Sequence, residues 1–322
     1  MIRKFFKGLL LLIVIALIAL FAWGYAADVP VAELKAKYAN AESEFVDLGG
    51  GLTVHLRDEG PQDAPAIILL HGSNSQLQTW DEWTAKLKDK YRIIRLDLPG
   101  HGITGPDPKD DYSIAASISV IDRLAGNRGL THFTLGGNSM GGGISYAYAL
   151  AHPEKLDGLI LVDAAGAPDN SKKELPIGFR IMQTPIINQI ATVITPRSFV
   201  EKSLRSSVSR AGYIDAAEVD LYWNMLRRPG NRQATLKRFA AFANRDRNPK
   251  PVANLNIPTL ILWGQEDKLI PVAAVPWFEK QFRDHVTHIY PGTGHLPMQE
   301  VAGQSGDDVA AWMARPQLRK PL

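Results

Sequence analysis

Short apolar segments that alternate with stretches of helical periodicity limit this chain to a small set of folds. Most of them are continuous runs, such as AIILL at 66–70, as expected for strands buried on both faces of a parallel sheet. Segments with helical spacing, such as SIAASISVIDRLAG at 113–126, separate most of these runs. The alternation predicts a doubly wound, mostly parallel α/β sheet. The expected strands of this kind are 66–70, 92–98, 132–137, 156–163, 258–264 and 286–290.

A hairpin and a helical insertion add to this core. EFVDL and LTVHLRDEG alternate in polarity and flank the glycines at 49–51, which predicts a β-hairpin. Between Asp163 and Pro258 the sequence has helical spacing and no convincing strand. That interval is too long for a connection within a compact domain, so we expect an inserted helical subdomain, which we call the cap. The expected division is an N-terminal membrane segment at 1–27, a linker at 28–44, an α/β core at 45–165 and 251–322, and a helical cap at 166–250.

The N-terminus predicts a membrane-directed segment. Arg3, Lys4 and Lys7 precede an uncharged apolar stretch at 8–27, long enough to span a hydrocarbon core of about 30 Å. Its length and its late aromatic residues favour an uncleaved transmembrane anchor, while the small residues of GYAAD leave a cleaved signal peptide as the alternative. The positive-inside rule keeps the three cations in the cytoplasm. We therefore expect the remaining chain on the outer, periplasmic or extracytoplasmic side, either anchored or secreted.

Charge and cysteine content exclude several classes of function. The formal net charge is +3, and the three N-terminal cations account for all of it. The rest of the chain is neutral overall, which argues against a nucleic-acid partner. Because the chain has no cysteine, it forms no disulfide, thiolate metal site or cysteine nucleophile.

The octapeptide GGNSMGGG at 136–143 lies between an apolar run and a helical pattern. It contains G-x-S-x-G, in which Ser139 would occupy a strained turn between strand and helix. Side chains at positions 137 and 141 would collide with the neighbouring chain, and Gly137 and Gly141 remove them. The alternative is a glycine-rich helix start that packs closely or binds phosphate. Ser139 is thus a candidate nucleophile.

A serine nucleophile needs a histidine to take its proton and a carboxylate to hold that histidine. Of the eight histidines, His295 follows the last expected strand, at the carboxyl edge of the sheet where sites of open α/β folds form. Asp267 follows the preceding strand at the same edge. Asp163 and Glu266 are the alternative acids, and Asp267 is the preferred one.

Catalysis also needs amide donors for the oxyanion of a tetrahedral intermediate. The backbone N–H of Met140, directly after the candidate nucleophile, is one candidate donor. The backbone N–H of Ser73 is the other, because the pair His71-Gly72 leaves an expected strand just before it. His71 itself is expected to be a structural hydrogen-bonding residue.

Five motifs in order resemble those of the α/β-hydrolase fold superfamily, over about residues 45–315: LLHGSN, DLPGHG, GNSMGG, LWGQED and GTGHLP. The resemblance implies a nucleophile, acid and base at Ser139, Asp267 and His295, with the amides of Ser73 and Met140 as the oxyanion hole. It also implies that the helical insertion covers the site, that DLPGHG is a structural turn, and that no metal or organic cofactor takes part.

The resemblance also narrows the reaction. Haloalkane dehalogenases and epoxide hydrolases of this fold have an aspartate at the elbow, where this chain has Ser139. GNSMGG resembles hydrolases that cleave carbon–carbon bonds in meta-cleavage products, but those typically have tryptophan where this chain has Leu296. Ester hydrolysis is therefore the preferred prediction, with a carbon–carbon hydrolase and an inactive binding protein as alternatives. Apolar substrate groups are suggested by Phe179, Met182, Trp223, Met225 and Met298.

Overall fold

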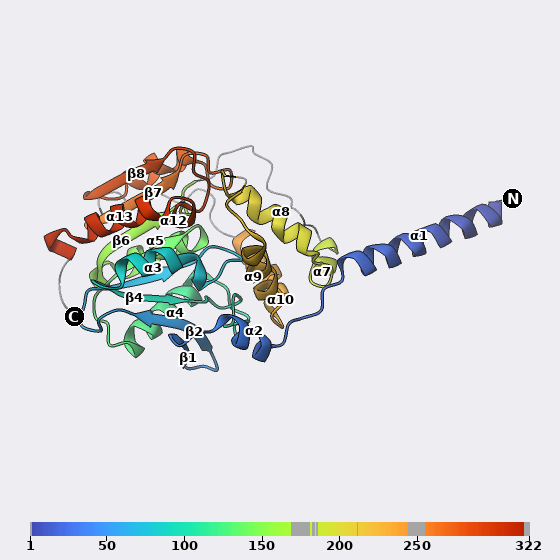
Figure 1. Ribbon diagram of the computed structural model, residues 1–322, viewed down its shortest axis with the longest axis horizontal. Coiled ribbons are helices and arrows are strands. Elements are labelled where there is room, and N and C mark those ends of the chain that lie inside the picture. Colours follow the sequence, from blue (N-terminus) through green and yellow to red (C-terminus); the bar gives the residue numbers. More distant parts are fainter. Residues whose placement is uncertain are drawn as a thin grey trace.

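An eight-stranded sheet forms the centre of the structure (Figure 1). The computed structural model describes residues 2–168, 181, 184, 186–210, 212–243 and 255–318. The strands are β1 Ser43–Asp47, β2 Thr53–Glu59, β3 Ala66–Leu70, β4 Arg92–Leu96, β5 Phe133–Asn138, β6 Leu156–Val162, β7 Thr259–Gly264 and β8 His285–Tyr290. Their order in the sheet is β1-β2-β4-β3-β5-β6-β7-β8. β2 pairs antiparallel with β1 and β4, and all other neighbours are parallel. The predicted doubly wound, mostly parallel sheet is confirmed.

Helices cover both faces of the sheet, and further helices follow β6. The helices are α1 Ile2–Gly24, α2 Val31–Tyr38, α3 Asp81–Leu87, α4 Ile114–Asn127, α5 Met140–Ala151, α7 Ile187–Ala191, α8 Arg197–Ser207, α9 Ala216–Leu226, α10 Asn231–Ala243, α11 Val275–Glu279, α12 Pro297–Glu300 and α13 Ala302–Met313. Short 3-10 helices are Leu77–Trp80, Pro153–Lys155, Val272–Ala274 and Pro316–Leu318. Helices α4, α5 and α11 pack in one hydrophobic cluster, and α3 and α13 in a second.

The two clusters take alternate residues of the same strands. In β3, Ile68 and Leu70 belong to the first cluster, whereas Ile67 and Leu69 belong to the second. Successive side chains of a strand point to opposite faces, so a strand covered by helices on both faces needs apolar residues throughout. The burial of every residue of β3 explains why its sequence is a continuous apolar run.

The predicted hairpin at residues 44–60 is also present. β1 and β2 pair with Asp47 opposite Thr53. The connecting glycines, 49 to 51, all have positive φ, a conformation that side chains with a Cβ rarely adopt. This glycine run therefore marks the turn that its composition predicted.

The helical interval between β6 and β7 holds α7, α8, α9 and α10 in the part of the chain that the structure describes. These helices gather at one side of the sheet, near the base of α1 (Figure 1). The expected pocket residues Phe179 and Met182 lie outside the described residues.

Helix α1 extends away from the rest of the structure (Figure 1). Among the described residues, no helix combines the length and apolarity needed to cross a membrane. The transmembrane segment predicted at 8–27 is therefore not supported. The helix ends at Gly24, and the next residue, Tyr25, forms a β-bridge with Ile194 of the cap. The helical stretch after Lys7 is therefore shorter than the apolar segment in the sequence.

Candidate active site

Ser139 lies at the turn between β5 and α5, with φ 54° and ψ −116°. This left-handed conformation is strained for a residue with a side chain. The turn fits only because the residues two positions before and after Ser139 are glycines. A Cβ on Gly137 would lie 2.3 Å from the carbonyl carbon of Gly141, and a Cβ on Gly141 would lie 2.2 Å from the carbonyl oxygen of Leu70. The turn therefore has the geometry expected of a nucleophile elbow.

The candidate base and acid are in direct contact. His295 Nδ1 lies 2.7 Å from Asp267 Oδ2, and both side chains are buried. The other carboxylate oxygen of Asp267 accepts hydrogen bonds from the amides of Leu269 and Ile270, at 2.7 and 3.1 Å. The carboxylate is thus fixed in place and can hold the imidazole with Nδ1 protonated, which leaves Nε2 as the proton acceptor.

Asp163, the alternative acid, lies beside this pair and is not the hydrogen-bond partner of His295. It is fully buried at the carboxyl end of β6, with φ 43°. Its Oδ1 accepts from the amide of Gly264 at 3.0 Å. Burial, and then the charge of Asp267, raise the pKa of Asp163 well above the usual range. Asp163 is thus held as a neutral carboxyl next to Asp267.

Asp163, Asp267 and His295 are also the one cluster of ligand-type side chains among the described residues whose donor atoms lie within 4.8 Å of one another. A metal ion at this point would have to replace the hydrogen bond between His295 and Asp267. The two backbone amides on Asp267 and the raised pKa of Asp163 instead match an acid that orients a histidine.

Two side chains without a predicted role, Asn138 and Glu300, hold the loop that carries His295. Asn138 Nδ2 donates to the carbonyl of His295 at 3.1 Å and to that of Val162 at 3.2 Å. Glu300 accepts from the amides of Gly294 and Ser209, at 2.8 and 2.7 Å. These hydrogen bonds hold the loop in one position, which catalysis requires. The local sequence around Glu300 contains no motif that predicts this role.

The cap also takes part in holding this loop. The backbone amide of His295 donates to the carbonyl of Ser207 at 2.7 Å. Ser207 is the last residue of α8. The candidate base is therefore bonded through its main chain to the helical insertion.

The backbone after β3 passes close to the elbow. A Cβ on Gly72 would lie 2.9 Å from Asn138 Oδ1 and 3.2 Å from the Cβ of Ser139. This approach brings Ser73, the proposed oxyanion residue, to the cavity that Ser139 also lines. The other proposed donor, Met140, is the first residue of α5. At a helix start, the amides have no partner within the helix, so they are available to an anion.

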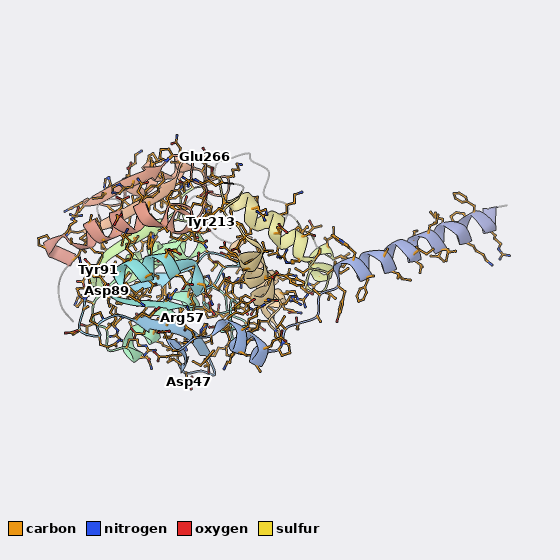
Figure 2. The ribbon with its side chains drawn as sticks, in the orientation of Figure 1. Asp47, Arg57, Asp89, Tyr91, Tyr213 and Glu266 are labelled. Carbon is orange, nitrogen blue, oxygen red and sulfur yellow. The ribbon has the colours of Figure 1, made fainter. Side chains whose placement is uncertain are left out.

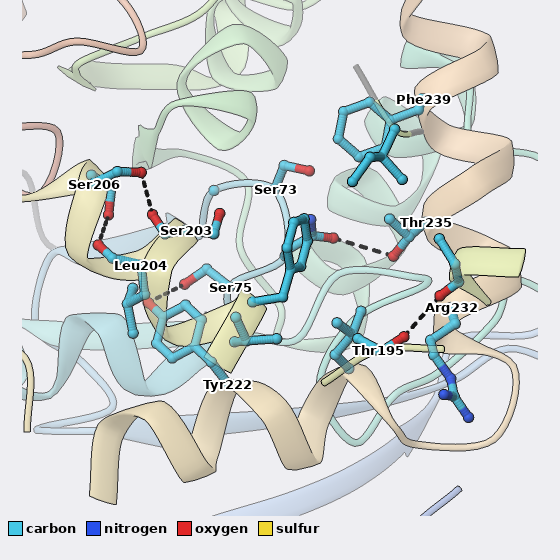
Figure 3. A pocket seen from close by; sticks show the side chains of 18 of the residues that line it. Ser73, Ser75, Thr195, Ser203, Leu204, Ser206, Tyr222, Arg232, Thr235 and Phe239 are labelled. Carbon is cyan, nitrogen blue, oxygen red and sulfur yellow. Dashed lines mark hydrogen bonds between the residues drawn. The ribbon is translucent and has the colours of Figure 1, made fainter. Parts of the chain in front are cut away.

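Ser139 and His295 line one cavity of about 570 Å³, which lies between the sheet edge and the cap. This volume is within the range of small-molecule sites. Figure 3 shows hydroxyl side chains along the lining, with Ser75 and Tyr222 joined by a hydrogen bond of 3.2 Å. The hydrogen bonds of the described side chains do not include one between Ser139 and His295. Most of the other lining is apolar and includes Ile187, Ile190, Ile194, Phe199, Phe239 and Leu296.

The prediction of pocket roles for Trp223, Met225 and Met298 is wrong. None of the three is among the described residues that line the cavity. Met225 packs with Val29 and Leu34, and Met298 is fully buried in the second core cluster. Trp223 donates from Nε1 to the carbonyl of Thr195 at 2.9 Å. An apolar residue at helical spacing can face either a core or a cavity, and these three face the core.

Glu266, the second alternative acid, is exposed and bonds to Ser209. Figure 2 shows it at the outer surface of the structure. It is not bonded to His295.

The motifs HGS and DLPGHG have the structural roles expected of them. His71 accepts from the amide of Leu98 at Nε2 and donates from Nδ1 to the carbonyl of Gly72, and its burial lowers its pKa to about 4. Asp97 is buried, accepts from the amides of Leu77 and Ile103, and lies 2.7 Å from His55 Nδ1. Both residues join loops of the core.

Comparison with known proteins identifies the family of this chain. A family model described as alpha/beta hydrolase fold matches residues 65–300. The chain belongs to this family.

The relatives of this chain include enzymes of two kinds. Lipase 1 of Psychrobacter immobilis is 24% identical over 283 residues, which cover 85% of this chain and 84% of that lipase. A 2-hydroxy-6-oxononadienedioate/2-hydroxy-6-oxononatrienedioate hydrolase from Pseudomonas is 22% identical over 288 residues, which cover 85% of this chain and 97% of that hydrolase. A solved structure of a bacterial membrane phospholipase A matches with a TM-score of 0.74 at 24% identity, over 97% of this chain and 98% of the other. The family and the lipase relative support hydrolase activity, and the structural match supports the fold.

Proposed function

We propose that this hydrolase cleaves carboxylic esters through an acyl-enzyme intermediate. Ser139 attacks the ester carbonyl while His295 takes its proton, and the amides of Ser73 and Met140 bind the oxyanion. His295 then protonates the leaving alcohol, activates a water molecule and releases the acid. Asp267 holds the imidazole throughout.

One observation carries this proposal. Ser139, on its strained turn, opens into the same cavity as a buried histidine whose second nitrogen is bonded to a buried carboxylate. These are the groups that activate a serine hydroxyl. In sites without substrate, catalytic hydrogen bonds are often long or not yet formed. We therefore expect the hydrogen bond between the Ser139 hydroxyl and His295 to form when substrate binds.

The lining of the cavity favours an ester over a substrate with several carboxylates. Arg232 is the one Lys or Arg among the described residues that line it. Its guanidinium is already paired with Asp28, at 2.6 Å. Leu296, buried beside His295, adds another apolar surface. An ester with apolar groups matches this lining better than the polar product of a ring cleavage. Lipase 1 of Psychrobacter immobilis is a relative whose name carries this chemistry.

The experiment compares the wild type with Ser139→Ala on a panel of activated esters and on a vinylogous diketo acid. We expect the wild type to hydrolyse esters and to be labelled by a serine-directed phosphonate, and the variant to do neither. Turnover of the diketo acid alone would favour the carbon–carbon alternative. Failure of the wild type to turn over or react would favour the inactive binding protein.

The location of the enzyme is a further part of the proposal. Helix α1 exposes apolar side chains such as Leu12 and Ile18, and Arg3 and Lys7 lie at its start. We propose that this segment keeps the catalytic domain attached to a membrane on the outer side, with secretion after cleavage as the alternative. Fractionation of cells, with protease added to intact cells, tests both: the attached form should sediment with membranes and be digested from outside.

A further inference from the structure

The chain directly after α1 is fastened to the cap, and we call residues 23–29 the strap. The carbonyl of Gly24 accepts from the amide of Thr195 at 2.9 Å, and the amide of Ala26 donates to the carbonyl of Val193 at 3.3 Å. Between these bonds, Tyr25 and Ile194 form an antiparallel bridge. The strap thus lies alongside residues 193–195 of the cap, joined to them by backbone hydrogen bonds.

An ion pair, a main-chain hydrogen bond and an apolar contact hold the rest of the strap. Asp28 pairs with the buried guanidinium of Arg232, and the amide of Val29 donates to the carbonyl of Arg227 at 2.9 Å. Val29 is buried against Met225 in a cluster of its own. The strap is therefore anchored at one end to the connection between α7 and α8 and at the other to Arg227, directly after α9, and Arg232 in α10.

The cap residues that the strap contacts are also residues of the substrate cavity. Ile194, Thr195 and Arg232 all line it. Trp23, the first residue of the strap, lines it as well, although 65% of its surface is exposed. A large apolar side chain that is both exposed and part of the lining lies at the rim of the cavity, far in sequence from the elbow.

The closeness of this contact depends on Gly24. A Cβ there would lie 2.3 Å from Ile194 Cγ2, so the two chains can approach only with glycine at this position. Gly8, in the same helix, has nothing within 4 Å of a Cβ. The glycine at the cap end of α1 thus has a packing role that the other does not.

We propose that Trp23, held by the strap, is a specificity-determining residue that forms the outer end of the acyl-binding channel. The inference rests on the proposed ester hydrolysis and assigns its substrate class: esters whose linear acyl chain is long enough to run from Ser139 past Ile190 and Ile194 to Trp23. Short acyl chains end inside the cavity and do not reach it. Cleavage within GYAAD, at 24–28, would remove Trp23 and with it this end of the channel, so the proposal requires that the mature enzyme retains its N-terminal segment.

The test compares the chain-length dependence of kcat/KM for full-length variants, with p-nitrophenyl acetate, butyrate, decanoate and palmitate as substrates. Trp23→Ala should lower kcat/KM for the two long esters about fivefold or more, because apolar contact with the chain is lost, and for acetate less than about twofold. Trp23→Phe should restore most of the long-chain activity. Phe6→Ala, an exposed aromatic at the other end of the same helix, is the matched control and should leave the profile unchanged.

A second pair of variants keeps Trp23 and moves the strap. Gly24→Ala should produce the same selective loss with long esters, since its Cβ pushes the strap off Ile194, whereas Gly8→Ala should not. Mass spectrometry of the mature chain should find residues 1–27 present. Equal losses for short and long esters, or no loss in either variant, would overturn the inference while the esterase proposal stands. Absence of wild-type activity on all four esters would instead refute the proposed function itself.

Discussion

His55 Nδ1 lies 2.7 Å from Asp97 Oδ2, the same separation that joins His295 to Asp267. Ser43 Oγ lies 3.0 Å from His55 Nε2, so a serine, a histidine and an aspartate are joined by hydrogen bonds at a place other than the candidate site. The hydroxyl of Ser43 is already used, because it accepts from Arg57 and from the amide of Asn40. Ser43 lies on a β-strand and not at an elbow.

Ser43, His55 and Asp97 therefore give a control for the candidate site. Ser43→Ala should keep kcat/KM for short esters within about twofold of wild type, because the loss of a partly buried hydrogen bond of this kind affects only stability, by about 1 kcal/mol. Kinetics and phosphonate labelling of Ser43→Ala and Ser139→Ala, side by side, check this. A loss of labelling in Ser43→Ala would mean that the assignment of the nucleophile is wrong.

Asp267→Asn should lower kcat by about 10³ to 10⁴ with little change in stability. The amide keeps an oxygen for the backbone donors of Leu269 and Ile270 but offers His295 the wrong partner, which favours the wrong tautomer. Steady-state kinetics together with thermal unfolding measure the two effects.

Glu266→Gln is the matched control, because it alters the adjacent carboxylate, which is exposed. It should leave kcat within about twofold. An equal loss in both variants would point to damage of the loop and not to the loss of an acid.

Asp163→Asn should stabilise the protein more at pH 8 than at pH 5. In the folded state the pKa of Asp163 is raised, first by burial and then by Asp267, whereas in the unfolded chain it is near 3.9. Between these two pKa values the folded state holds a proton that the unfolded state releases, so stability falls as pH rises above about 4. An asparagine keeps the neutral shape and removes this dependence.

Urea unfolding at the two pH values measures the difference. Asp89→Asn, at an exposed position, should show no such difference (Figure 2). If the stability of Asp163→Asn relative to wild type instead falls as pH rises, Asp163 is ionised in the native state and the assignment of the proton is wrong.

Gly141→Ala should abolish activity and destabilise the fold, because its Cβ would meet the carbonyl oxygen of Leu70, a main-chain atom that cannot turn away. Overpacking of this kind costs about 1 to 3 kcal/mol. Gly126→Ala, within α4 and with open space around its Cβ, should stabilise the protein by about 0.5 to 1 kcal/mol. Denaturant unfolding of both, with ester kinetics, checks the contrast. Activity in Gly141→Ala would show that the elbow can relax.

The order of the elements followed from the sequence because the physical demand on each strand was strong. Strands buried on both faces need continuous apolar runs, and β3 matched its predicted range of 66–70. The glycines of the elbow were also readable, since only glycine tolerates the contacts that Gly137 and Gly141 make.

The cavity could not be read in the same way. Met225 and Ile190 are both apolar residues on cap helices, yet one is buried in a small core and the other lines the cavity. The difference depends on how the helices rotate against the sheet, which local pattern does not encode. The raised pKa of Asp163 was equally hard to predict, because it arises from burial and then from the charge of Asp267, more than a hundred residues away in the chain. Trp23 looked like part of a membrane segment, and only the strap placed it at the cavity.

The bond between the amide of His295 and the carbonyl of Ser207 joins two parts of the enzyme that are usually treated as separable. Because it is a main-chain bond, it does not depend on the side chain at either position, and only a proline at position 295, which has no N–H, would delete it. A chimaera that grafts the insertion of another family member onto this core would inherit the requirement: the graft succeeds only if its backbone presents a carbonyl at the same place.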